Sequence, residues 1–328
     1  MMTLPKQLAG KLRLPVIGAP MFLVSFPPLV TALCKAGLVG SFPHVNARST
    51  EELDAWLTMI EGDLADYQQA NPTALIGPIG VNLVLHDSNV RYKDDLDVVI
   101  KHKVPIVLTS LGNPGKIVEQ VHKYGGLVFS DVINARHAQK AADAGVDGII
   151  CIGGGAGGHA PVQNLVSLAR EVRKFWQGCL ILGGAINDGQ SIRACEVLGA
   201  DLAYVGTRFV ATKDSNAQQA YKDMIVKSGV TDLVYTDRLS GIGCNYLIPS
   251  LEKNEIDLTV LPPKKPDLSA LSDSNAKLWR DIWTAGHGIT NIHSIPSVET
   301  LVSDMEKEYN VACKLGVSAA IGSGVSDE

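Results

Sequence analysis

The chain has 328 residues, of which 46% are hydrophobic and 5% aromatic, and its net charge is −5. This length suffices for one large α/β domain, with or without an appended subdomain. The sequence has no basic cluster, so nucleic-acid binding and adhesion to an anionic membrane are disfavoured. The N-terminus lacks the apolar stretch of a signal peptide, and no apolar run is long enough to cross a membrane.

The six cysteines form no C-x-x-C pair, and most lie in apolar surroundings. They are Cys34, Cys151, Cys179, Cys195, Cys244 and Cys313. Such residues pack like small hydrophobic side chains in a reducing compartment. We therefore expect a soluble cytoplasmic protein with no zinc or other metal site. The sequence leaves open whether the chain forms a homodimer.

Short apolar runs alternate with helical patterns from the N-terminus to residue 210. A helical pattern after the first run ends at Gly37, and the capping-box residues 49–52 begin the next helix. The runs do not alternate with polar residues, which indicates strands buried on both faces of a parallel sheet. They span residues 15–21, 38–42, 76–83, 105–111, 126–132, 149–152, 179–184 and 201–207. Strand and helix thus alternate about eight times, which predicts a (β/α)8 TIM barrel, with an open doubly wound sheet as the alternative.

The alternation stops beyond Gly229. Residues 231–251 have the composition of a loop-rich segment, and residues 298–315 form an amphipathic helical pattern. We therefore divide the chain into a barrel over residues 1–229 and a mainly helical extension over residues 230–328. The extension is expected to lie over the barrel mouth and to contribute to the substrate pocket. Within it, the helical spacing of Trp279 and Trp283 favours a packing role for Trp283, and packing is also the preferred role of His287.

The stretch from Asp147 to Pro161, D-G-I-I-C-I-G-G-G-A-G-G-H-A-P, combines a buried strand, five glycines and one histidine. The glycines leave backbone N–H groups free to approach a large flat or anionic ligand. His159 follows them directly, and an imidazole is the side chain that exchanges protons near neutral pH. We therefore take His159 as the candidate catalytic residue.

The same stretch contains a G-x-G-x-x-G pattern at Gly153, Gly155 and Gly158. A dinucleotide-binding fingerprint requires a helix that opens at the third glycine and an acidic residue about 20 positions further on, after a second strand. Here Pro161 delays the helix, and Glu171 lies inside a helical pattern. The Rossmann interpretation therefore fails.

Small and polar residues gather where the expected strands end, and in a barrel all these ends meet at one face. Two of the ends, Gly183-Gly184 and Gly206-Thr207, follow the seventh and eighth strands, where barrels commonly bind phosphate through backbone N–H groups. The other end of such a ligand would face Met21, Asn82 and His159. An extended planar ligand such as flavin mononucleotide (FMN) fits this arrangement better than a sugar phosphate does.

Five motifs in order carry a resemblance to a known family. They are A-P-M at 19–21, G-V-N-L at 80–83, A-G-G-H at 156–159, L-G-G-A at 182–185 and V-G-T-R-F at 205–209. With these the chain resembles the FMN-dependent nitronate monooxygenases, once called 2-nitropropane dioxygenases. S-G-I-G-C-N-Y-L-I-P-S-L at 240–251 and W-T-A-G-H-G at 283–288 look like the C-terminal motifs of that family.

The resemblance implies that His159 is the catalytic base and that FMN lies against the strand ends. The implied cofactor contacts are Ala19, Pro20, Met21, Asn82, Thr109, Asp131, Gly157, Gly158, Gly183, Gly184, Gly206 and Thr207. Ile152 stands where some members carry Gln, and Asp131 stands where others carry Lys. Because a carboxylate would oppose the negative charge of a reduced flavin, Asp131 is expected to face a ribityl hydroxyl.

The implied reaction is the oxidation of alkyl nitronates, and of nitroalkanes, with O2 to carbonyl compounds and nitrite. An NAD(P)H-dependent flavin reductase acting on quinones or enoyl thioesters is the alternative, because such enzymes share these motifs. A barrel that only binds a phosphate ligand, and a phosphosugar aldolase, rank lower. The aldolase would need a Schiff-base lysine at a strand end, and the chain has no obvious one.

Overall fold

The computed structural model describes residues 4–86, 89–266 and 277–315. Eight parallel strands close into a barrel, because the last strand pairs with the first. The barrel strands are β1 (Val16–Gly18), β2 (Val39–Pro43), β3 (Ile79–Val84), β4 (Ile106–Ser110), β5 (Leu127–Val132), β6 (Gly148–Ile152), β8 (Cys179–Gly183) and β9 (Leu202–Val205). The closed barrel confirms the (β/α)8 prediction and excludes the open doubly wound sheet.

The barrel strands are buried on both faces, which explains why their sequences do not alternate. Leu108, Phe129 and Ile181 belong to a cluster inside the barrel, whereas the adjacent residues Val107 and Val128 pack in the larger cluster shared with the helices. Successive side chains of a strand point to opposite faces. At each strand end, therefore, only one of two neighbouring residues can direct its side chain toward the barrel mouth.

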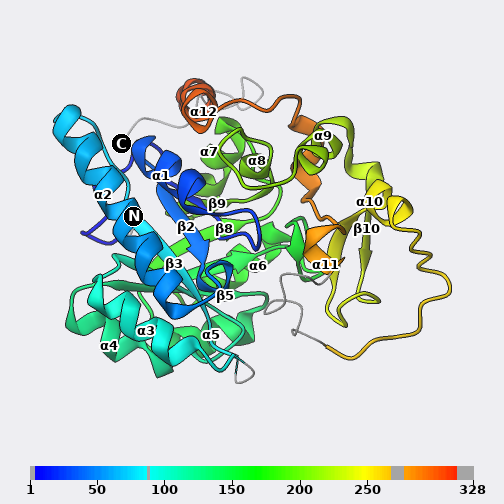
Figure 1. Ribbon diagram of the computed structural model, residues 1–328, viewed down its shortest axis with the longest axis horizontal. Coiled ribbons are helices and arrows are strands. Elements are labelled where there is room, and N and C mark those ends of the chain that lie inside the picture. Colours follow the sequence, from blue (N-terminus) through cyan, green and yellow to red (C-terminus); the bar gives the residue numbers. More distant parts are fainter. Residues whose placement is uncertain (1–3, 87–88, 267–276, 316–328) are drawn as a thin grey trace, which may run out of the picture.

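Helices follow the strands around the barrel (Figure 1). The Ser49 side chain accepts the N–H of Glu52 and caps α2, and Gly37 has φ +80 after α1, so both predicted helix boundaries are confirmed. The helices are α1 (Pro27–Lys35), α2 (Thr50–Ala70), α3 (Tyr92–Lys101), α4 (Val118–Lys123), α5 (Ala135–Asp143), α6 (Leu165–Val172), α7 (Gly189–Val197), α8 (Thr207–Val210), α9 (Gln219–Lys227), α10 (Ile248–Lys253), α11 (Lys277–Arg280) and α12 (Val298–Cys313). None of the helices in the described ranges is long and apolar enough to span a membrane.

The last helix, α12, packs against α7 and α1 on the outer wall of the barrel (Figure 1). A Cβ at Gly189 would lie only 2.2 Å from the Met305 carbonyl oxygen, so the contact with α7 is close. Arg13 and Glu306 add an ion pair at 2.7 Å. This helix therefore fills the place of the eighth barrel helix, whereas the sequence suggested that it would help to cover the mouth.

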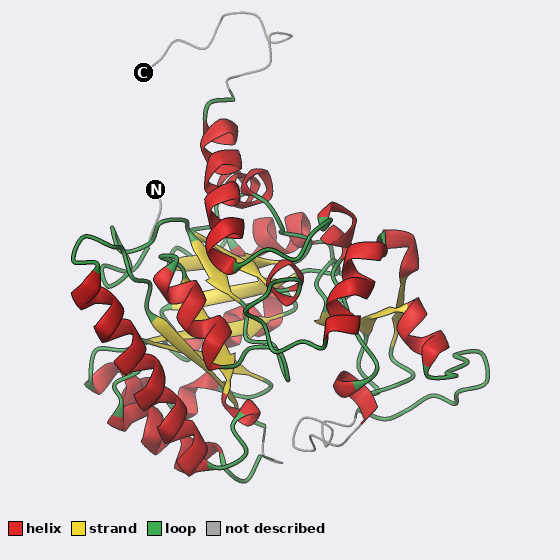
Figure 2. Ribbon diagram, turned by 45° about the horizontal axis from the view of Figure 1, so that its top comes forward, coloured by secondary structure: helices red, strands yellow, loops and turns green. Residues whose placement is uncertain are grey.

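The segment before α12 lies at the barrel mouth and carries a small sheet that the sequence did not predict. Strands β10 (Leu233–Thr236) and β11 (Cys244–Leu247) form an antiparallel hairpin within the segment expected to be loop-rich. β11 also pairs with β7 (Gly158–His159), which comes from the glycine-rich barrel loop. Figure 2 shows this second group of strands beside the barrel. The candidate histidine is thus held between the barrel and the extension.

A buried polar network fixes the loop that follows β2. The Asp95 carboxylate accepts hydrogen bonds from His44 Nδ1 at 2.5 Å, from the Thr50 hydroxyl at 2.6 Å and from Arg91 at 2.9 Å. His44 Nε2 accepts from the Asn89 side chain at 2.9 Å, so the imidazole is neutral with its proton on Nδ1. Burial lowers the pKa of His44, which keeps it in this form. The network joins the end of β2 to α2 and α3.

Replacing Asp95 with Ala is expected to lower the free energy of unfolding by about 3–5 kcal/mol, because the buried partners lose their shared acceptor. Urea unfolding followed by circular dichroism measures the change. Asp97→Ala on the same helix removes an exposed carboxylate and should change stability by less than about 0.5 kcal/mol. Equal effects of the two substitutions would contradict a structural role for this network.

Candidate active site

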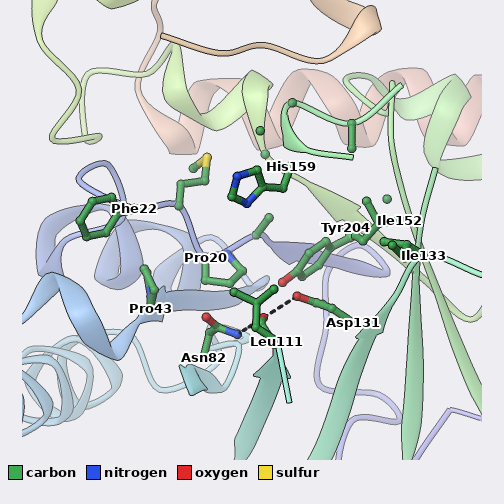
Figure 3. A pocket seen from close by; sticks show the side chains of 18 of the residues that line it. Pro20, Phe22, Pro43, Asn82, Leu111, Asp131, Ile133, Ile152, His159 and Tyr204 are labelled. Carbon is green, nitrogen blue, oxygen red and sulfur yellow. Dashed lines mark hydrogen bonds between the residues drawn. The ribbon is translucent and has the colours of Figure 1, made fainter. Parts of the chain in front are cut away.

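The strand ends and the extension enclose a cavity of about 1100 Å³ (Figure 3). Eleven of the twelve expected cofactor contacts, and the candidate histidine, line it. They are Ala19, Pro20, Met21, Asn82, Asp131, Gly157, Gly158, His159, Gly183, Gly184, Gly206 and Thr207. The cavity exceeds the usual range of about 300–1,000 Å³ for small-molecule sites. It has room for a cofactor and a substrate together.

Thr109 is the one expected contact that does not line the cavity. Its side chain is buried, and its hydroxyl donates to the Phe129 carbonyl at 3.3 Å. The next residue, Ser110, faces the cavity instead, because neighbouring side chains of a strand point in opposite directions. The sequence located the correct strand end but not the correct side of the pleat.

Asn82, Ser110 and Asp131 form a hydrogen-bonded chain on the cavity floor (Figure 3). The Asn82 amide donates to the Ser110 hydroxyl at 2.7 Å, and that hydroxyl donates to Asp131 Oδ2 at 2.7 Å. Burial raises the pKa of the Asp131 carboxyl to about 6, although the Ser110 hydrogen bond opposes this. The carboxyl is therefore partly protonated near pH 6, and it opposes a negatively charged ligand less than an ordinary aspartate would.

Two buried oxygens on this floor have no hydrogen-bond partner in the described part of the chain. They are Asp131 Oδ1 and the Tyr204 hydroxyl. In Figure 3 the Tyr204 side chain points toward the Asp131 carboxylate. Tyr204 comes from β9, and its side chain lies beside Gly183 of the neighbouring strand β8. Because unpaired buried polar atoms are costly, this side of the cavity suits a ligand with a polar edge.

His159 lies on the opposite side of the cavity from Asp131 and Tyr204 (Figure 3). Its Nε2 atom is 3.2 Å from the Ser240 hydroxyl oxygen, and its ring makes a T-shaped contact with the Trp279 ring, with centroids 5.1 Å apart. Burial lowers the pKa of His159 to about 4. The imidazole is therefore neutral at physiological pH and has a lone pair that can accept a proton.

The two glycine pairs after β8 and β9 form the end of the cavity expected to bind phosphate. The backbone N–H groups of Gly184, Gly206 and Thr207 donate to no acceptor in the described ranges. Gly184 has φ +134, a conformation that side chains other than glycine rarely adopt. The Thr207 hydroxyl accepts the Gly286 N–H at 2.9 Å, which ties the extension to this end of the cavity.

The extension contributes residues that the sequence did not assign to the site. Trp279, Trp283, Thr284 and Gly286 line the cavity, and Trp283 stacks on Tyr221 with centroids 5.1 Å apart. No single helix carries both tryptophans: α11 ends at residue 280, and Trp279 has φ +74. The W-T-A-G-H-G motif was a usable signal for Thr284 and Gly286, whereas nothing in the sequence marked Trp279.

His287 is not among the residues that line the cavity. Its backbone N–H donates to the Gly155 carbonyl at 2.9 Å. The expected packing role for this residue therefore agrees with its position, since it holds the extension against the glycine-rich loop.

The comparisons with known proteins agree with a redox enzyme built on this barrel. A sequence profile described as nitronate monooxygenase matches residues 6–308. A probable nitronate monooxygenase of Staphylococcus aureus strain JH9 is 26% identical over 259 residues, which cover 69% of this chain and 73% of that protein. The solved structure of FabK from Thermotoga maritima has a TM-score of 0.76 and 25% identity, covering 96% of this chain and 98% of that one.

A nitroalkane oxidase from Streptomyces ansochromogenes superposes with a TM-score of 0.78 and 22% identity over 94% of this chain and 99% of that one. At this identity the likeness concerns the fold. The family match places this barrel enzyme in the flavin-dependent oxidoreductase class. Within that class, the chain belongs to the nitronate monooxygenase family.

Proposed function

We propose that this enzyme oxidises alkyl nitronates, and nitroalkanes after loss of a proton, with O2 to carbonyl compounds and nitrite. The observation that carries the proposal is a neutral imidazole, His159, on the wall of a cavity large enough for a cofactor and a substrate. Family membership gives the reaction class. Oxygen consumption and nitrite release with a panel of nitronates test the proposal.

FMN is the proposed cofactor, and the residues present fit it. Gly184, Gly206 and Thr207 offer free N–H groups for its phosphate, and the unpaired Asp131 and Tyr204 oxygens suit a polar ring edge or ribityl group. Asn187 also lines the cavity. Its buried Nδ2 atom has no hydrogen-bond partner in the described ranges. When bound, the flavin supplies electron transfer and the reaction with O2.

His159 is the proposed base for neutral nitroalkanes. A nitroalkane carries an acidic proton on the carbon next to the nitro group, and a neutral imidazole can accept that proton. Met21, Phe22 and Trp279 line the same cavity and carry no charge. These side chains give the substrate carbon skeleton an apolar environment beside the imidazole.

The acid limb of kcat/KM for a neutral nitroalkane is expected near pH 4. His159 must be neutral to accept a proton, and its pKa of about 4 means that activity is present above this pH and is lost below it. Initial rates of oxygen consumption across pH measure the limb. Asp131 titrates near pH 6 in the same cavity, so the profile of Asp131→Asn identifies its contribution. A limb near the ordinary histidine pKa of about 6.5 in both proteins would contradict this assignment.

An NAD(P)H-dependent flavin reductase acting on quinones or enoyl thioesters is the second candidate. The size of the cavity and its aromatic walls favour it, because they leave space for a large second molecule beside a flavin. Anaerobic mixing with NADH separates the two functions. Rapid loss of flavin absorbance with NADH supports the reductase, and loss only with nitronate supports the monooxygenase.

A cytoplasmic location is part of the proposal, supported by six free cysteine thiols, five of which are buried. The sequence leaves a homodimer open, and size-exclusion chromatography with light scattering measures the oligomeric state. The division at residue 229 also stays a prediction.

A further inference from the structure

A buried hydroxyl from the extension contacts the candidate base. Ser240 is 1% exposed, and its Oγ atom lies 3.2 Å from His159 Nε2. The same Oγ donates to the Ile242 carbonyl at 3.0 Å and accepts the Ile242 N–H at 3.3 Å. Ser240 begins the S-G-I-G-C-N-Y-L motif, which had no assigned role in the chemistry.

The hydrogen bonds of Ser240 determine which nitrogen of His159 carries the proton. A serine hydroxyl has one proton to donate and two lone pairs that accept. The proton goes to the Ile242 carbonyl, which has no other donor in the described ranges, and one lone pair accepts the Ile242 N–H. With the hydroxyl proton on the Ile242 carbonyl, Ser240 Oγ meets His159 Nε2 as an acceptor. This arrangement favours a proton on Nε2 and leaves Nδ1 with its lone pair.

The packing around His159 keeps the ring in this orientation. Its backbone pairs with Cys244 of β11, and the next residue, Ala160, donates its N–H to the Gly243 carbonyl at 3.0 Å. The edge contact with Trp279 closes another side of the ring. Both the backbone and the ring of His159 are thus held by the extension.

We propose that Ser240 is a positioning residue that holds His159 in the tautomer with the proton on Nε2, so that Nδ1 is the atom that accepts the substrate proton. The part of the proposal that makes Nδ1 the base rests on the proposed function. The tautomer itself is a property of the protein and is tested without any substrate. Failure of the tautomer assignment and failure of the nitronate monooxygenase assignment are therefore distinguishable.

The first test is long-range proton–nitrogen NMR of protein labelled with ¹⁵N-histidine, at a pH well above the His159 pKa of about 4. The His159 signals are identified by their loss in His159→Asn. We expect a protonated Nε2 and an unprotonated Nδ1 in the wild type, and a mixture of tautomers in Ser240→Ala. A proton on Nδ1 in the wild type, or an unchanged pattern in Ser240→Ala, would overturn the proposal.

The controls separate this role from a general effect of removing a buried hydroxyl. Ser250 is also buried in the extension; it donates to the Asp281 carbonyl and accepts the Trp283 N–H, and it has no contact with His159. Ser250→Ala is expected to keep the wild-type tautomer. Ser240→Thr keeps the hydroxyl and is expected to retain the tautomer, so it carries the test if Ser240→Ala does not fold.

The second test is kinetic. Ser240→Ala is expected to lower kcat/KM for neutral nitroalkanes by about 10–100-fold, the size of effect seen when a group that orients a functional histidine is removed. Preformed nitronates need no proton transfer to His159, so their kcat/KM should fall by a smaller factor. Equal losses for both substrate forms would contradict a role in proton transfer.

Discussion

Replacing His159 with Asn is expected to lower the turnover of neutral nitroalkanes by about 10²–10⁴-fold, the usual contribution of a general base. Asn is polar and smaller, so β7 can keep its pairing with β11, but the amide cannot accept the substrate proton. Oxygen consumption and nitrite release measure the rate. The visible spectrum of the purified variant reports whether the flavin is retained.

Preformed nitronates provide the matched comparison for this variant. They have already lost the proton, so their turnover should fall much less than that of the neutral compounds. Full activity of His159→Asn on neutral nitroalkanes, with flavin bound, would show that another group is the base.

Replacing Gly184 with Ala is expected to weaken FMN binding by about 10–100-fold. Its φ of +134 is strained for any residue with a Cβ atom, at a cost of about 1–3 kcal/mol, and relief of that strain moves the N–H away from the phosphate. Fluorescence titration of the flavin-free protein with FMN measures the dissociation constant.

Gly10→Ala is the control for backbone strain alone. Gly10 has φ +71 and no atom within 4 Å of an added Cβ, and it lies outside the cavity lining. This variant should lose stability but keep the wild-type affinity for FMN. An unchanged affinity for FMN in Gly184→Ala would show that the loop after β8 does not bind the phosphate.

The barrel was predictable because its signals are local. Strands such as β6 and β8 are buried on both faces and read as unbroken apolar runs, and Gly37 ends its helix at a positive φ. The positions of the strand ends follow from the barrel topology. The cavity-lining positions of Asn82, Gly184 and His159 could therefore be predicted without coordinates.

The remaining features depend on tertiary contacts. Ser110 lines the cavity, whereas the predicted contact Thr109 points the other way. The sequence does not determine which face of β4 points into the barrel mouth. Tyr204 reaches the floor from β9, and its sequence context shows only a buried strand residue. The packing of α12 against α7 joins segments about a hundred residues apart, so its amphipathic pattern could not reveal its partner.

The pairing of β7 with β11 was hidden for a similar reason. Gly158 and His159 form a strand of only two residues, and its partner lies in the extension. No periodic pattern can arise in so short a segment. Yet this pairing brings Ser240 to His159 and so determines how the candidate base is held.

The measurement that tests the central proposal most directly compares oxygen consumption with a small panel of alkyl nitronates against NADH oxidation with benzoquinone, using the same purified enzyme. A nitronate monooxygenase consumes oxygen and releases nitrite with the nitronates, and it oxidises NADH slowly or not at all. Rapid NADH oxidation with no nitronate-dependent oxygen uptake would contradict the proposed function and identify the enzyme as a reductase.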